Sequence, residues 1–136
     1  MATAKRRARR KGGYCALHEE ILDSPAYRDL TPAARALHVE LLRLYRPDRN
    51  GALSLEVRKA AEQTRTHKDT ASRAFRELAE HGFIALRHGE RWMDHLAREW
   101  RITSEPCNGR EPTDDWREWQ PGKPVAKLPQ RKKTRS

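Results

Sequence analysis

The sequence has little of what secreted, membrane-bound or metal-binding proteins require. Its two cysteines, Cys15 and Cys107, lie far apart, and no signal-peptide-like apolar segment is present, so we expect no disulfide framework and a reducing, cytoplasmic compartment. No apolar run approaches the ~20 residues of a membrane-spanning helix, so we expect no membrane association. Cys15 and His18 lack the second half of a zinc site, so we expect no metal and no other cofactor.

The sequence also lacks the motifs that mark enzymes. It has no glycine-rich phosphate loop, no nucleophile beside an apparent base, and no carboxylate cluster beyond ordinary surface acids. We therefore expect neither catalysis nor a small-molecule substrate. A small nuclease that uses His88 and His95 is the enzymatic alternative that this pattern leaves open.

Positive charge is abundant but concentrated at the two ends of the chain. The 136 residues carry a formal net charge of +10, and residues 1–13 and 121–136 each hold six basic residues and no acidic one. Because these segments lack the apolar content to fold, we expect them to be disordered basic arms around one domain, residues 14–120. Within that domain, residues 58–101 hold ten Lys or Arg against seven acids and form its positive part.

Two Ser/Thr-Pro pairs mark helix starts in the first half of the domain. The hydroxyl residue can cap the first turn, and proline suits the first helical position. Ser24-Pro25 therefore predicts a short helical turn before Leu30. Thr31-Pro32 predicts a long helix that ends before Pro47. The buried stripe of this long helix is predicted to contain Ala33, Leu37, Leu41 and Leu44, widened by Leu42 and Tyr45.

From Ser54 to Arg87 the pattern indicates two short helices, a tight turn and a strand. Ser54 is the predicted N-cap of the first helix. The apolar side of that helix comprises Val57, Ala60 and Ala61. The second helix is expected to begin at about His67, with Thr66 and Asp69 in a loose capping box. Its buried side is predicted to comprise Ala71, Ala74, Phe75 and Leu78.

Strand patterns follow the second helix. Gly82 suits a left-handed position at the helix end, and residues 83–86 have the content of a short buried strand. Residues 99–103 alternate polar and apolar side chains, as a returning antiparallel strand does, and the residues between these strands would form a wing tip. Residues 52–53 are a candidate third strand that pairs with the wing.

Trp116 and Trp119 lie three positions apart near the end of the predicted domain. Their acidic neighbours Asp114, Asp115 and Glu118 would repel phosphates, which argues against a role in stacking on nucleic-acid bases. We therefore expect the two tryptophans to form a clasp that packs onto the core.

These features resemble the winged helix-turn-helix family of bacterial DNA-binding proteins. The segments that carry the resemblance are Ala60–Gln63, Asp69–Leu78 and Gly82–Ile84. Residues 22–119 are also similar to small winged-helix proteins of phage, plasmid and replication-linked contexts, through Asp23–Ala26, Ala34–Leu37 and Glu99–Thr103. The chain departs from the family pattern at Arg65-Thr66-His67, where a small residue, a hydrophobic residue and a serine are usual.

The resemblance implies a mainly α fold with a small β wing and sequence-specific binding of double-stranded DNA, in transcription regulation or replication initiation. The second helix, here called the reader helix, would enter the major groove. Its DNA-binding residues, with those of the preceding turn, would be Arg65, Thr66, Lys68, Asp69, Thr70, Ser72, Arg73 and Arg76. The wing would contribute Arg87, His88, Arg91 and Trp92. The arms would contribute Lys5, Arg6, Arg7, Arg9, Arg10, Lys11, Arg131, Lys132 and Lys133.

Alternatives remain open at the level of sequence. Arg73 and Arg76 could belong to an ordinary solvated helix face, paired at i,i+4 with Glu77 and Glu80. Asp69 suits helix capping better than contact with a cytosine amino group. The chain as a whole could be an RNA-binding or ribosome-associated protein in which the winged helix is a docking module. A homodimer is compatible with either function.

Overall fold

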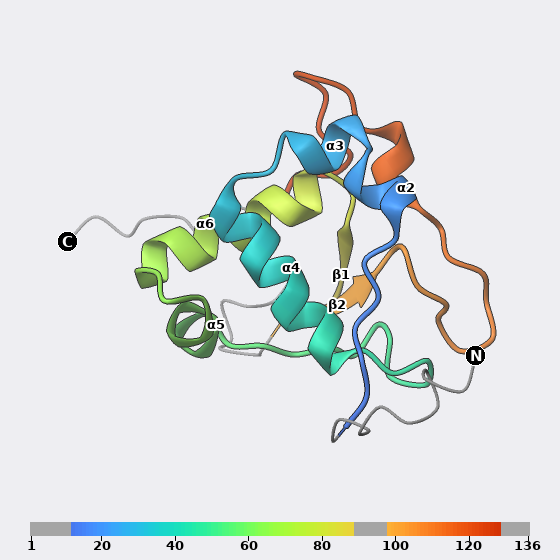
Figure 1. The fold of residues 1–136 in the computed structure, drawn as a ribbon, viewed down its shortest axis with the longest axis horizontal. Helices are drawn as coiled ribbons and strands as arrows, with labels where there is room; N and C mark the ends of the chain where they lie inside the picture. Colours follow the sequence, from blue (N-terminus) through green and yellow to red (C-terminus); the bar gives the residue numbers. More distant parts are fainter. Residues whose placement is uncertain (1–11, 89–97, 129–136) are drawn as a thin grey trace, which may run out of the picture.

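Five α-helices and one two-stranded antiparallel sheet make up residues 12–88 and 98–128, the part of the chain that the computed structural model describes (Figure 1). In chain order the elements are α2 (Glu19–Leu22), α3 (Pro25–Arg28), α4 (Pro32–Leu44), α5 (Val57–Thr64), α6 (Lys68–Glu80), β1 (Ile84–His88), β2 (Glu99–Ile102) and the 3-10 helix η2 (Asp115–Glu118). The mainly helical content with a small sheet agrees with the sequence-based expectation. Helices α4, α5 and α6 pack against one another, and β1 follows α6 directly.

The two Ser/Thr-Pro pairs start helices as predicted. The Ser24 hydroxyl accepts the N–H of Tyr27, and the Thr31 hydroxyl accepts the N–H of Ala34 at 3.3 Å. Each helix has proline in its first turn, where the missing N–H would have had no helical partner anyway. Helix α4 ends at Leu44, as predicted from the proline that follows.

The buried stripe of α4 differs by a small rotation from the predicted one. Leu37, Leu41 and Leu42 are buried as expected, but Ala33 is only half-buried and Leu44 is 36% exposed. The stripe instead begins at Ala34 and includes a polar residue that the apolar pattern did not anticipate. Its members are Ala34, Leu37, His38, Leu41 and Leu42.

Both predicted strands and the short third segment are confirmed. Strands β1 and β2 are antiparallel with Ile84 opposite Ile102. Leu53 forms an isolated antiparallel bridge with Trp100 of β2. The Trp100 ring stacks on Phe75 of α6 with their centroids 5.6 Å apart, so the sheet is packed directly against the inner face of that helix.

The predicted N-cap of α5 is wrong. The helix begins at Val57 and its N-cap residue is Glu56, which makes no side-chain capping bond. Ser54 instead follows the residue that bridges to β2, and the chain stays extended until Glu56. Pairing with a strand far along the sequence thus overrides the local capping preference of Ser54.

The predicted capping box of α6 is also wrong in its residues. His67 is the N-cap, and its Nδ1 accepts the N–H of Asp69 at 3.1 Å. The Thr66 hydroxyl bonds instead to the Thr64 hydroxyl at 2.9 Å, which removes it from the helix start. At the other end of α6, Gly82 has φ +85°, so its predicted left-handed conformation is confirmed.

The tryptophan clasp packs onto the core as predicted. Trp116 of η2 is 5% exposed, its ring lies parallel to that of Phe83, and its indole N–H donates to Asp114 at 3.0 Å. Trp119 is partly buried and stacks on His81 with centroids 4.8 Å apart. The clasp therefore covers the junction between α6 and β1.

The packed chain continues beyond residue 120, where the domain was expected to end. Val125 donates its N–H to the carbonyl of Glu80 at 2.7 Å, and the Leu128 side chain is buried in the core. Residues 121–128 were assigned to a basic arm because of their composition, but their two apolar residues, Val125 and Leu128, anchor this segment to the domain. Residues 1–11 and 129–136, which contain the proposed DNA-binding residues of the arms, lie outside the described residues.

The buried histidine of α4 has an unusual environment. His38 is 1% exposed and its ring contacts those of Tyr27 and Phe83, with centroids 6.0 and 5.5 Å away. Neither ring nitrogen has a hydrogen-bond partner among the described residues. Burial therefore favours the neutral ring and lowers the pKa of His38 to about 4.

The low pKa of His38 should make the fold acid-sensitive. Below its ordinary pKa of about 6.5 the histidine of the unfolded chain takes up a proton, whereas the buried ring stays neutral down to about pH 4. The free energy of unfolding should therefore fall with decreasing pH across that window, by an amount on the order of 3 kcal/mol. Denaturant titrations from pH 7 to pH 4 would measure this loss.

The control for this prediction is His38→Leu, which fills the same space without a titratable group. Carboxylates contribute equally to the pH dependence of both proteins, so the difference between the two profiles isolates His38. Identical profiles would show that His38 does not cause the acid sensitivity.

Candidate nucleic-acid interface

The turn between α5 and α6 places an arginine in a left-handed conformation. Arg65 has φ 57° and ψ 43°, and its N–H bonds to the carbonyls of Ala61 and Glu62 at the end of α5. Only glycine adopts this conformation without a steric penalty, and this chain has arginine there. The departure from the usual turn sequence is therefore accommodated by the backbone, and the Arg65 side chain is exposed at the start of the reader helix.

The two sides of α6 are divided as the sequence predicted. The side chains that pack inward are Ala71, Ala74, Phe75 and Leu78, joined by Ala79. On the outer side, Lys68, Asp69, Ser72 and Arg73 are exposed, and Thr70 and Arg76 are half-buried. The outer side of α6 therefore presents the polar and cationic residues that were proposed to contact DNA.

Glu77 has a structural role in the cap of α4. Its carboxylate accepts the backbone N–H of Thr31 at 2.5 Å and the Thr31 hydroxyl at 2.9 Å. Thr31 is the N-cap of α4, so Glu77 completes that cap across the helix pair. The carboxylate that could have paired with Arg73 on an ordinary solvated helix face is therefore directed to α4.

The two arginines on the outer side of α6 are Arg73 and Arg76. Among the described residues neither arginine forms an ion pair, and no contact joins Arg76 to Glu80. Another cation, Arg98, precedes β2 and lies near Arg76. Burial lowers the pKa of Arg98, and the positive charge of Arg76 lowers it further. The two arginines therefore lie close together where α6 meets the start of β2.

Two residues of the proposed reader set make contacts within the turn and at the start of α6. Thr66 is half-buried with its hydroxyl bonded within the turn. The Asp69 carboxylate lies 3.7 Å from Nδ1 of His67, so it faces the helix cap. This position is consistent with a local role of Asp69 at the start of the helix, where the dipole also favours a carboxylate.

The predicted wing residues are not all brought together with α6. Arg87 is exposed on β1, but its side chain packs against Gly51, in the turn that follows α4. His88 ends β1, and Arg91 and Trp92 lie outside the described residues. The Arg87 side chain therefore lies beside the turn after α4, which the linear pattern could not reveal.

Comparisons with family models, curated proteins and solved structures returned no match for this chain. No helix within residues 12–88 and 98–128 has the length and apolar content to cross a membrane. In the same part of the chain, no three His, Cys, Asp or Glu side chains are grouped so that they could hold a metal ion. The arrangement of cations around α6 is therefore the basis for a functional assignment.

Proposed function

We propose that the chain is a winged helix-turn-helix protein that binds double-stranded DNA with α6 in the major groove. The order α4, Leu53 bridge, α5, α6, β1, β2 matches the expected arrangement of such a domain. The observation that carries the proposal is the pair of outward arginines, Arg73 and Arg76, for which the described part of the chain provides no carboxylate partner. In the case of Arg73, the neighbouring Glu77 caps α4 instead. An uncompensated cationic helix face attracts a polyanion.

The chemistry of these arginines suits a DNA groove. A guanidinium is a planar fork that bonds two acceptors at once, either the O6 and N7 atoms of guanine or two phosphate oxygens. Lys68, at the first position of α6, adds a charge that can be placed near a phosphate. We propose that such contacts serve transcription regulation or the initiation of replication, and that the basic arms add phosphate contacts that do not depend on sequence.

The test replaces both outward arginines in the full chain. DNA recovered with the protein from cells and sequenced would supply the preferred site. Arg73→Ala/Arg76→Ala should retain its melting temperature, because neither side chain packs in the core, and should lose about 1–3 kcal/mol of binding free energy per base contact. Binding to the preferred duplex is measured by fluorescence anisotropy in the presence of competing non-specific DNA.

The matched control is Arg28→Ala/Arg43→Ala, which removes the same charge from arginines paired with Asp23 and Glu40. This control should bind the preferred duplex nearly as well as the wild-type protein. Equal binding by the α6 variant and the wild type would refute the proposal. A preference of the wild-type protein for RNA over duplex DNA would support the alternative in which the chain is an RNA-binding or ribosome-associated protein and its winged helix is a docking module.

A further inference from the structure

A second group of unpaired arginines lies away from α6. This group, here called the arginine rim, occupies the turn after α4, the end of β1 and a hairpin near residue 108. Its members are Arg46, Arg49, Arg87 and Arg110. All four are exposed, and none forms an ion pair with any described residue. By contrast, Arg28, Arg43, Arg101 and Arg117 each have a carboxylate within 4.0 Å.

Backbone contacts hold the two loops of the arginine rim together. Asn108 donates its N–H to the carbonyl of Pro47 at 3.0 Å, and the Cys107 thiol donates to the carbonyl of Asn50 at 2.9 Å. The hairpin is closed by reciprocal bonds between the backbones of Cys107 and Arg110, at 3.1 and 2.9 Å. The arginines therefore project from a fixed surface formed by residues 46–51 and 107–110.

Gly51 makes room for the third member of the rim. It has φ +101°, and a Cβ added there would lie 3.2 Å from Nη1 of Arg87 and 3.3 Å from its Cδ. The same added atom would lie 3.8 Å from Sγ of Cys107. Because Gly51 has no side chain, the Arg87 side chain can lie against the turn after α4 and near the hairpin.

The charge of the rim is not neutralised by its acidic neighbours. Asp48 and Glu111 lie in or beside the same segments, but neither forms an ion pair with a rim arginine. Residues 46–51 and 107–111 together with Arg87 carry four arginines and two acids, which gives these residues a net charge of +2. The two segments also contain none of the large exposed apolar side chains that anchor protein interfaces.

We infer that the arginine rim is a second phosphate-binding surface, which contacts the backbone of nucleic acid without reading its bases. Arginine matches phosphate oxygens through its planar fork, and the lack of an apolar anchor disfavours a protein partner. The turn after α4 lies at the right of Figure 1, whereas α5 and the start of α6 lie at the left, so the rim is distinct from the reader surface. The inference rests on the proposed function for the identity of the polyanion.

The experiment uses the full chain with Arg49→Ala/Arg110→Ala. The side chains of Arg49 and Arg110 make no hydrogen bond or ion pair with described residues, so this variant should fold normally. Binding to a duplex of random sequence is measured over a range of salt concentrations. Each lost phosphate contact should make the slope of log affinity against log salt shallower by about 0.9, or roughly 1.8 for both.

The control for the rim is again Arg28→Ala/Arg43→Ala, which removes the same charge elsewhere. A shallower slope for the rim variant alone supports the inference, and coincident slopes for the two variants overturn it. The two proposals can fail separately. If Arg73→Ala/Arg76→Ala keeps its full preference for the DNA site while the rim variant shows a shallower salt slope, the reader assignment fails and the rim stands. If Arg73→Ala/Arg76→Ala loses that preference while the rim variant keeps the wild-type salt slope, only the rim is refuted.

Discussion

Replacing Gly82 with alanine should destabilise the protein strongly. Gly82 has φ +85°, and a Cβ built on it would lie 2.7 Å from the backbone nitrogen of Trp116 and 2.8 Å from the carbonyl carbon and oxygen of Asp115. These atoms belong to the backbone of η2, so they cannot be displaced by a simple rotamer change. The clasp would have to move away from the junction of α6 and β1.

The expected magnitude combines two physical terms. A left-handed backbone costs about 1–2 kcal/mol for a residue with a Cβ. Forcing an extra methyl group into a packed site typically costs a further ~1–3 kcal/mol. Gly82→Ala should therefore lower the free energy of unfolding by about 2–5 kcal/mol, a large share of the stability of a small domain. Denaturant titration monitored by tryptophan fluorescence would measure the loss.

Gly109→Ala is the matched control for Gly82→Ala. Gly109 has nearly the same φ, +82°, but a Cβ there would meet nothing within 4 Å. The control should therefore show the backbone term alone, and the difference between the variants reports the contact with η2. Equal destabilisation by both substitutions would contradict the close approach of η2 to Gly82.

The features that local sequence predicts correctly are those decided by neighbouring residues. Ser24 and Thr31 cap their helices because the hydroxyl and the amide that it accepts are three positions apart. The inward face of α6 follows from helical spacing alone. The left-handed Gly82 is decided by the helix end beside it. In each case the deciding interaction lies within one or two turns of the chain.

The features that were missed depend on distant partners. Ser54 does not cap α5, because its neighbour Leu53 pairs with Trp100 and keeps this segment extended. Glu77 does not pair with its neighbour along the helix, because Thr31 offers it two donors. No pattern within either segment encodes these contacts, so they appear only when the elements pack.

In the candidate site too, local patterns predicted positions along the helix but not contacts with distant residues. The outward position of Arg73 was predictable from the spacing of α6, whereas its lack of a carboxylate partner depended on the capping of α4 by Glu77. Arg87 was assigned to the wing because it follows a strand, yet Gly51 places its side chain beside the turn after α4. Arg49 and Arg110, which we propose as part of the arginine rim, were not singled out because their turns carry no recognisable binding motif.

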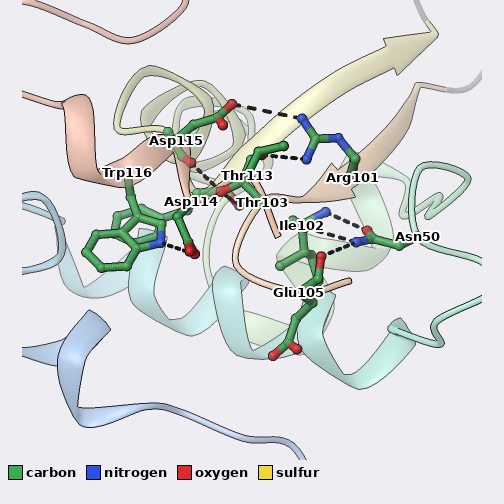
Figure 2. A network of polar contacts seen from close by, with 11 residues as sticks. Asn50, Arg101, Ile102, Thr103, Glu105, Thr113, Asp114, Asp115 and Trp116 are labelled. Atoms are coloured by element: carbon green, nitrogen blue, oxygen red, sulfur yellow. Dashed lines mark hydrogen bonds and ion pairs between the residues drawn. The ribbon is translucent and has the colours of Figure 1, made fainter. Parts of the chain in front are cut away.

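The second large effect is expected at Asn50, which joins the turn after α4 to the end of β2 (Figure 2). Asn50 is 1% exposed and its side-chain oxygen accepts the N–H of Ile102 at 2.7 Å. Its amide nitrogen faces three carbonyls, those of Ile102 at 2.9 Å and of Glu105 and Pro106 at 3.1 Å. The buried Asn50 side chain therefore bonds both to Ile102, the last residue of β2, and to the chain that follows it.

Asn50→Leu should lower the free energy of unfolding by about 2–6 kcal/mol. The substitution introduces an apolar side chain of similar size. It leaves the N–H of Ile102 and the carbonyl of Glu105 without their partner, whereas the Ile102 carbonyl still accepts the N–H of Glu105 at 3.5 Å. Each group that loses its partner costs about 1–3 kcal/mol. Denaturant titration would measure the change. A loss below about 1 kcal/mol would mean that the backbone groups find other partners and that the Asn50 contacts do not hold this region.

Asn50→Asp separates the accepting from the donating role of the side chain. The new carboxylate can still accept the N–H of Ile102, but it has no proton to offer the carbonyls that face the amide nitrogen of Asn50. Protonation would restore one donor, so the deficit relative to wild type at the same pH should shrink as the pH falls toward about 4. The donor role is refuted if Asn50→Asp matches wild-type stability at neutral pH. Asn50 lies in the turn that carries Arg49, and its partners precede the hairpin that carries Arg110, so a confirmed loss would show that the contact between these two segments stabilises the fold.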